Sequence, residues 1–135
     1  MRELLQSLQS ADQESAEEAL FHLRMKICHQ GVAVSRETAI ALPTLLDIVE
    51  ARKTTLRIEV LRLVADISRS SHAWRRSAKN AQPQYAGNYT DKIEWETAVD
   101  RAFEDALPCL GRLESDADPE IAALAHGLAE RHWEA

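Results

Sequence analysis

The sequence predicts an all-α fold built from pairs of helices, with one irregular insert in the second half of the chain. Apolar residues recur at the helical period of about 3.6 along most of the sequence. The alternating apolar and polar positions that indicate strands are missing, and so is the Asn-Gly signal of a tight hairpin. A stretch of the first half also matches a stretch of the second half, which is typical of a repeated structural unit.

The first part of the chain is expected to form two pairs of helices. The first pair covers roughly residues 2–10 and 13–30 and ends at Gly31, because glycine commonly terminates a helix. Ser35 is expected to cap a third helix, and a fourth helix follows from Leu56. The apolar stripes are Leu4, Leu5 and Leu8; Ala16, Leu20, Leu23 and Ile27; Ala39, Leu42, Leu45, Leu46 and Val49; and Leu56, Val60, Leu63, Val64 and Ile67.

The third pair of helices is expected after the insert. Thr90 can cap a fifth helix that continues to Leu110. A sixth helix opens with the sequence DPE, in which Asp118 is the N-cap, Pro119 occupies the first helical position and Glu120 lies in the first turn. These start signals agree with the apolar stripes around them.

The chain contains an internal repeat. Residues 41–67 align without a gap on residues 106–132, and this alignment pairs Pro43 with Pro108, 65 positions further on. Both prolines lack a backbone N–H group and are expected to kink the third and fifth helices. The N-terminal stretch matches the same unit more loosely at an offset of 41, and the difference between the offsets has the length of the insert. The sequence therefore predicts three helical hairpins with one insertion before the last.

The repeat resembles a known family. A helix-pair period of about 40 to 47 residues is typical of HEAT and armadillo arrays. A proline inside the first helix, followed by DPEIAALAHGLA at the start of the second, resembles the HEAT repeat. The sequence CHQGVAVSRETAIALPTLLDIV is also similar to a group of small bacterial HEAT-like proteins. The resemblance covers most of the chain except residues 70–92, and it implies a short α-solenoid of stacked helix pairs.

Length and composition predict one soluble domain, residues 1–135. Apolar residues make up 45% and charged residues 28% of the chain, as in ordinary globular proteins. No apolar run reaches the ~18 residues of a membrane span, and the N-terminal sequence resembles an amphipathic helix rather than a signal peptide. Cys28 and Cys109 belong to no CxxC pair and are expected to be buried and reduced. We therefore expect a complete small cytoplasmic protein.

The insert differs from the rest of the chain in charge and in aromatic content. Residues 70–95 hold Trp74, Tyr85, Tyr89 and Trp95, which are four of the seven aromatic residues. Residues 69–92 carry five basic side chains and one acidic side chain, a local charge of +4, whereas the remainder of the chain carries −10. An acidic body repels phosphates, so a general nucleic-acid binder is not expected.

Two interpretations of the insert remain open. Trp74 and Trp95 can fold back to cover the gap between the second and third hairpins, with the tyrosines at the rim. Alternatively, an exposed cluster of Trp, Tyr and Arg forms an interaction hot spot, and long insertions in compact domains are usually functional. Both hold if Trp95 is buried while Tyr85 and Tyr89 are presented. The start of the insert, HAWRRSAKN, can form two helical turns, whereas Pro83 and Gly87 predict a loop.

Catalytic and metal-binding motifs are missing from the sequence, so no enzyme, cofactor or metal site is predicted. Neither GxSxG, HExxH nor CxxC occurs. His22 and His29 lie about 10 Å apart along a helix, and His29 is interpreted as a helix C-terminal residue near the last carbonyl groups. The acidic residues Glu17, Glu18, Glu114, Asp116 and Asp118 are interpreted as solvated helix surface or first-turn acids.

The predicted task is binding of another protein. The resemblance implies a concave face lined by the second helix of each pair, where Arg24, Arg57, Glu59 and Arg62 are candidates. The residues predicted to bind the partner are Trp74, Arg75, Arg76, Lys79, Tyr85, Tyr89, Arg57 and Arg62. Membranes and nucleic acids are not expected partners, and the oligomeric state stays open.

Three functions are compatible with the resemblance. A small acidic bacterial HEAT-like protein is similar to an inhibitor of one partner, such as an immunity protein that neutralises a contact-delivered toxin domain. Its acidic surface would speed association with a basic partner. The alternative is an assembly adaptor or regulatory scaffold. A HEAT-like DNA glycosylase comes third, because such an enzyme needs a basic cleft and the net charge here is −6.

Overall fold

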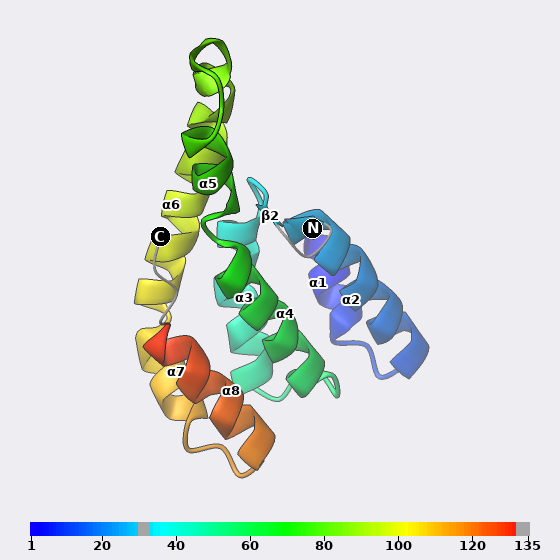
Figure 1. The fold of residues 1–135 in the computed structure, drawn as a ribbon. Coiled ribbons are helices and arrows are strands. Elements are labelled where there is room, and N and C mark those ends of the chain that lie inside the picture. The colour runs from blue at the N-terminus through cyan, green and yellow to red at the C-terminus, as the bar shows by residue number, and fades with distance from the viewer. Residues whose placement is uncertain (30–32, 132–135) are drawn as a thin grey trace.

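The protein is all-α, apart from one very short pair of strands (Figure 1). The structure is a computed structural model that describes residues 1–29 and 33–131. Its elements are α1 (Arg2–Leu8), α2 (Gln13–Ile27), β1 (Cys28–His29), β2 (Ala33–Val34), α3 (Thr38–Glu50), α4 (Arg57–Ser70), α5 (Ala73–Lys79), the 3₁₀ helix η1 (Pro83–Tyr89), α6 (Thr90–Asp105), α7 (Leu107–Leu113) and α8 (Pro119–Glu130).

The second helix is shorter than the sequence predicts. It begins after Asp12, whose side chain accepts a hydrogen bond from the Ser15 backbone at 3.2 Å, and it ends at Ile27 rather than near residue 30. The chain then pairs β1 with β2 in an antiparallel ladder, with Cys28 opposite Val34. The expectation of a chain without strands is therefore wrong here, and His29 is a strand residue rather than the end of a helix. Gly31 lies outside the described residues.

The start of α3 also differs from the prediction. Its N-cap is Glu37, and Ser35 lies in the turn before it, where the Ser35 hydroxyl accepts a hydrogen bond from the Glu37 backbone at 3.3 Å. The Thr38 hydroxyl donates to the carbonyl of Ile27 at 2.6 Å. This buried hydrogen bond ties the start of α3 to the end of α2. Pro43 lies inside α3 as predicted.

The predicted fifth helix is two helices. It breaks at Ala106, between α6 and α7, just before Pro108. Proline supplies no backbone N–H group and clashes with the preceding turn, so a continuous helix to Leu110 is not formed. Thr90 does not cap α6, because the helix begins at Thr90 and its N-cap residue is Tyr89; the Thr90 hydroxyl donates to the carbonyl of Gly87.

The start of α8 is as predicted. The Asp118 side chain accepts a hydrogen bond from the Glu120 backbone at 2.9 Å. Pro119 occupies the first turn, where no partner for its missing N–H group is needed.

The helices form two layers (Figure 1). The helices α2, α4 and α8 lie side by side in one layer, and α3 lies behind them next to α6 and α7. Side-chain contacts from α2 to α4 and to the turn before α4 join residues 42 positions apart, as in Arg24 with Asp66 and Gln13 with Thr55. Contacts from α4 to the start of α8 show a similarly constant offset of 58 or 59. A constant offset means that α2 and α4 run in the same direction, and so do α4 and α8.

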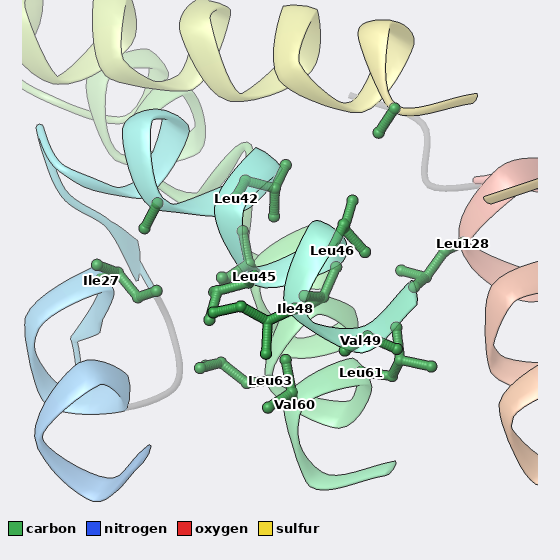
Figure 2. Close-up of a cluster of buried hydrophobic side chains, with 14 of the residues drawn as sticks. Ile27, Leu42, Leu45, Leu46, Ile48, Val49, Val60, Leu61, Leu63 and Leu128 are labelled. Carbon is green, nitrogen blue, oxygen red and sulfur yellow. The ribbon is translucent and has the colours of Figure 1, made fainter. Parts of the chain in front are cut away.

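The hydrophobic core lies between the layers (Figure 2). The helix α3 is buried on several sides, because it packs between α4 in front and α6 beside it. The labelled core residues are Ile27, Leu42, Leu45, Leu46, Ile48, Val49, Val60, Leu61, Leu63 and Leu128, all buried. Cys28 and Cys109 are buried free thiols, as predicted. None of the helices in the described part of the chain has the length and apolar content needed to cross a membrane.

The insert forms an arm, which we define as residues 72–96. It contains α5 and η1, and the first turns of α6 run back alongside α5. The two helical turns at the start of the insert are as predicted, whereas the segment with Pro83 and Gly87 is a 3₁₀ helix rather than a loop. Figure 1 shows the arm extending beyond the ends of the other helices.

Candidate functional site

A buried carboxylate holds the base of the arm. The Glu96 side chain, on α6, is fully buried and accepts hydrogen bonds from the backbone nitrogens of Trp74 at 2.7 Å and Arg75 at 3.0 Å. These N–H groups belong to the first turn of α5, which has no side-chain cap from its own N-cap residue. Burial raises the pKa of Glu96, and the two backbone hydrogen bonds oppose that increase. Glu96 therefore caps α5 from a different helix.

Trp74 ties the arm to the short strand pair. Its indole N–H donates to the carbonyl of Val34 on β2 at 2.9 Å. The outer face of the ring contacts Tyr89, with centroids 6.5 Å apart, and Lys92, whose Nζ lies 5.2 Å from the ring centroid. Trp74 and Trp95 are both half-buried against the core. The geometry thus gives Trp74 a structural role at the base of the arm.

Asp100 connects three basic side chains near the same base. Its carboxylate lies 3.2 Å from His72 Nε2, 3.0 Å from Arg75 Nη1 and 3.3 Å from Arg131 Nη2. Arg131 also lies over the ring of Phe103, 4.0 Å from the centroid, and burial lowers the pKa of Arg131 to about 10. The charge of Arg75 is therefore largely offset, since Arg75 also lies near Glu96.

The outer part of the arm presents three of the predicted residues to solvent. Arg76 and Lys79 are exposed, and neither forms an ion pair with a residue that the structure describes. Tyr85, on η1, is 54% exposed. Tyr89 is half-buried against Trp74 instead. The structure therefore separates the predicted cluster into an inward-facing base and an outward-facing tip.

A basic hollow runs along one side of α5. It has a volume of about 590 Å³ and is lined by His72, Arg75, Arg76, Lys79 and Asn80. None of the described residues that line it carries a carboxylate. The hollow is therefore a place where an anionic group of a partner gains favourable contacts.

The predicted cations of the second helices are already paired. Arg57 is 13% exposed and lies 2.7 Å from Asp116, and its Nε donates to the carbonyl of Val49 at 2.8 Å. Arg62 pairs with Glu120 on α8, and Arg24 pairs with Asp66 on α4 at 2.5 Å. The pairs of Arg24 and Arg62 join neighbouring helices of the front layer, and the pair of Arg57 joins α4 to the turn before α8. Arg57 and Arg62 thus lie away from the arm, in structural ion pairs.

The environment of Asp116 contradicts one interpretation made from the sequence. Its side chain is only 8% exposed, so Asp116 is not a solvated surface acid. The hydrogen bond from Arg57 is the main cause that lowers the pKa of Asp116, with help from the Asp118 backbone. Glu17, Glu18 and Glu114 are exposed, as predicted.

Sequence reasoning missed the residues that hold the arm, namely His72, Glu96, Asp100 and Arg131. A signal for two of them was present, because Glu96 and Asp100 are four residues apart and share one face of a helix. That acidic face follows residues 69–92, which carry five basic side chains. The partnership of the two segments could have been proposed from this charge pattern, but the burial of Glu96 could not.

The described residues include two free thiols and many His, Asp and Glu side chains. No group of three or more His, Cys, Asp or Glu side chains among them is arranged to hold a metal ion. Burial, with the nearby Glu50 carboxylate, raises the pKa of Cys109 to about 11, and burial also raises the pKa of Cys28. Both thiols therefore remain protonated and weakly nucleophilic at neutral pH.

Comparisons with protein-family profiles, with curated proteins and with solved structures found no match. The geometry of the arm and of the helix layers therefore carries the functional conclusion.

Proposed function

We propose that this protein is a non-enzymatic protein-binding module, a short α-solenoid of three HEAT-like helix pairs that presents the arm to a partner protein. One observation carries the proposal. The arm extends beyond the helix layers and exposes Arg76, Lys79 and Tyr85, while buried contacts of Trp74 and Glu96 fix its base.

The chemistry of the tip suits protein recognition. Tyrosine and arginine are enriched in interaction hot spots, because they combine apolar area with hydrogen-bonding groups. A segment that is already ordered loses less conformational entropy when it binds. The Glu96 cap and the Trp74 hydrogen bond supply that order before any partner arrives.

Within this class we favour a cytoplasmic inhibitor, such as an immunity protein that neutralises a contact-delivered toxin. The small size and the acidic body support it, because a net charge of −6 steers association with a basic partner. An assembly adaptor is the alternative. The DNA glycosylase interpretation is not favoured, because the arginines of the front layer, Arg24, Arg57 and Arg62, have carboxylate partners within the protein.

The test is an affinity capture from the native cells at low and high salt, followed by mass spectrometry. The arm variant R76E/K79E/Y85A is compared with the control F21A/R36E/K53E, which makes the same change of charge and removes one exposed aromatic ring elsewhere. We expect one stoichiometric partner that the wild type and the control retain and the arm variant loses. Capture of no protein, or equal capture by all three, would contradict the proposal.

A further inference from the structure

We propose that the basic hollow beside α5 binds an acidic peptide segment of the partner, with two carboxylate side chains placed against Arg76 and Lys79. This inference rests on the proposed protein-binding function and adds the chemistry of the partner. It starts from the hollow of about 590 Å³ and its five lining residues, His72, Arg75, Arg76, Lys79 and Asn80.

The charge around the hollow is uncompensated at its outer end only. At the inner end, Asp100 contacts both His72 and Arg75, and Glu96 lies 3.8 Å from Arg75. At the outer end, Arg76 and Lys79 have no carboxylate partner among the described residues. The inner carboxylates thus hold His72 and Arg75 in place, whereas Arg76 and Lys79 remain available for a ligand.

The pairing of other arginines makes this contrast informative. Arg24 and Arg62 each contact a carboxylate of a neighbouring helix, and Arg57 contacts Asp116 in the turn before α8. The chain has 22 acidic residues against 16 basic ones, so intramolecular partners are plentiful. The described lining of the hollow contains cations and no acid, so it can offer an anionic side chain the kind of contact that the arginines of the front layer already make within the protein.

The dimensions fit a short extended segment. The seven residues of α5 span about 10 Å, which corresponds to roughly three residues of an extended chain. Arg76 and Lys79 are three positions apart and therefore lie on the same face of the helix. In an extended peptide, alternate side chains point the same way and lie about 6 to 7 Å apart. We therefore expect acidic residues at alternate positions, with the Arg76 guanidinium able to hold one carboxylate in a bidentate manner.

A nucleic acid fits these observations less well. Its affinity comes from the neutralisation of many phosphates along a continuous basic track. Here the uncompensated cations of the hollow are Arg76 and Lys79, and the chain outside residues 69–92 carries a charge of −10. A compact pair of carboxylates can reach the hollow without bringing further negative charge close to that surface.

The test uses a fluorescein-labelled peptide of alternating Glu and Ser residues, and the same peptide with Gln in place of Glu. Binding to the full chain is followed by fluorescence anisotropy at low and high salt. We expect the Glu peptide to bind at low salt, and to bind about tenfold more weakly to R76E/K79E. The control R36E/K53E makes the same change of charge at exposed sites, and its affinity for the Glu peptide should stay within about twofold of the wild-type affinity. The Gln peptide should bind the wild-type protein about as weakly as the Glu peptide binds R76E/K79E.

Three results would overturn the inference. They are no binding of the Glu peptide, an equal loss in the R36E/K53E control, or tighter binding of a single-stranded oligothymidine of the same charge. The last result would assign the hollow to nucleic acid. Failure of this inference is distinguishable from failure of the proposed function, because affinity capture that depends on the arm would then still yield a protein partner.

Discussion

The carboxylate of Glu96 lies 2.7 Å from the backbone nitrogen of Trp74, so a buried acid of α6 holds the first turn of α5. The same Trp74 donates its indole N–H group to β2. The first hydrogen bond joins the two sides of the arm at its base, and the second connects the arm to the strand pair. The orientation of Arg76 and Lys79 therefore depends on residues that face away from solvent.

The first prediction concerns Glu96→Ala. This change leaves the backbone N–H groups of Trp74 and Arg75 without their acceptor, and we expect a loss of about 1–3 kcal/mol in the free energy of unfolding. Urea unfolding followed by tryptophan fluorescence measures it. Glu94→Ala is the control, because Glu94 is exposed on the same helix, and its effect should stay within about 0.5 kcal/mol. Equal stability of the two variants would mean that Glu96 does not hold the arm.

The second prediction concerns the pH dependence of stability through Asp116. Its pKa is lowered from the ordinary 3.8, mainly by the hydrogen bond from Arg57. A carboxyl group whose pKa is lower in the folded state stabilises the fold above the unfolded pKa, and this stabilisation is lost as the pH falls through the folded pKa. Asp116→Asn should therefore be less stable than the wild type at neutral pH, and the difference should shrink below pH 3.8.

Chemical unfolding of both proteins across this pH range measures the effect of Asp116. Asp105→Asn is the matched control, because Asp105 is exposed, and its difference from the wild type should change little with pH. A gap between Asp116→Asn and the wild type that widens in acid would contradict the prediction.

Part of the fold could be predicted because local signals and burial agree. The apolar stripes of α3 and α4 became the core, and the Asp118 cap formed as expected. Other features depend on tertiary contacts that no local signal contains. The strand pair after Ile27 is an example, whereas the break at Ala106 had a local signal in Pro108, from which only a kink was predicted.

The candidate site was predicted in composition but not in arrangement. Clustering of aromatic and basic residues marked the insert, and Arg76, Lys79 and Tyr85 are exposed there. Which member faces inward depends on acceptors far along the chain, as with Trp74 and the carbonyl of Val34, 40 positions away. Single-sequence patterns do not report such distant acceptors. For the same reason, the carboxylate partner of Arg57 was not predicted.

The third prediction concerns the core between α3 and α4. Leu63 is fully buried there, so Leu63→Ala should cost about 2–5 kcal/mol through lost apolar contact and the cavity left behind. Ile40 lies on α3 but is 68% exposed, and Ile40→Ala should change stability by less than about 0.5 kcal/mol. Denaturant unfolding of both variants measures the contrast. Similar losses in the two would show that the layers do not pack as described.

The fourth prediction concerns the two thiols. Cys109 has a pKa raised to about 11 and Cys28 a raised pKa, and both are buried, so both should react slowly with a disulfide reagent at pH 8 in the native state. After denaturation in guanidinium both cysteines should react at once, so that each chain consumes two equivalents of the reagent. The variants C28S and C109S assign any residual native reactivity. Fast native reaction of either thiol would contradict its burial.

The fifth prediction separates the structural role of Trp74 from the binding role of Tyr85. Trp74→Phe removes the indole donor and leaves the buried carbonyl of Val34 without it, so we expect a loss of about 1–3 kcal/mol in unfolding free energy. Tyr85→Ala should change stability by less than about 0.5 kcal/mol, because that side chain is 54% exposed. Partner binding should show the reverse order, with a large loss for Tyr85→Ala and a small one for Trp74→Phe under conditions in which that variant is fully folded. If Trp74→Phe instead kept full stability and lost the partner, Trp74 itself would be the contact residue.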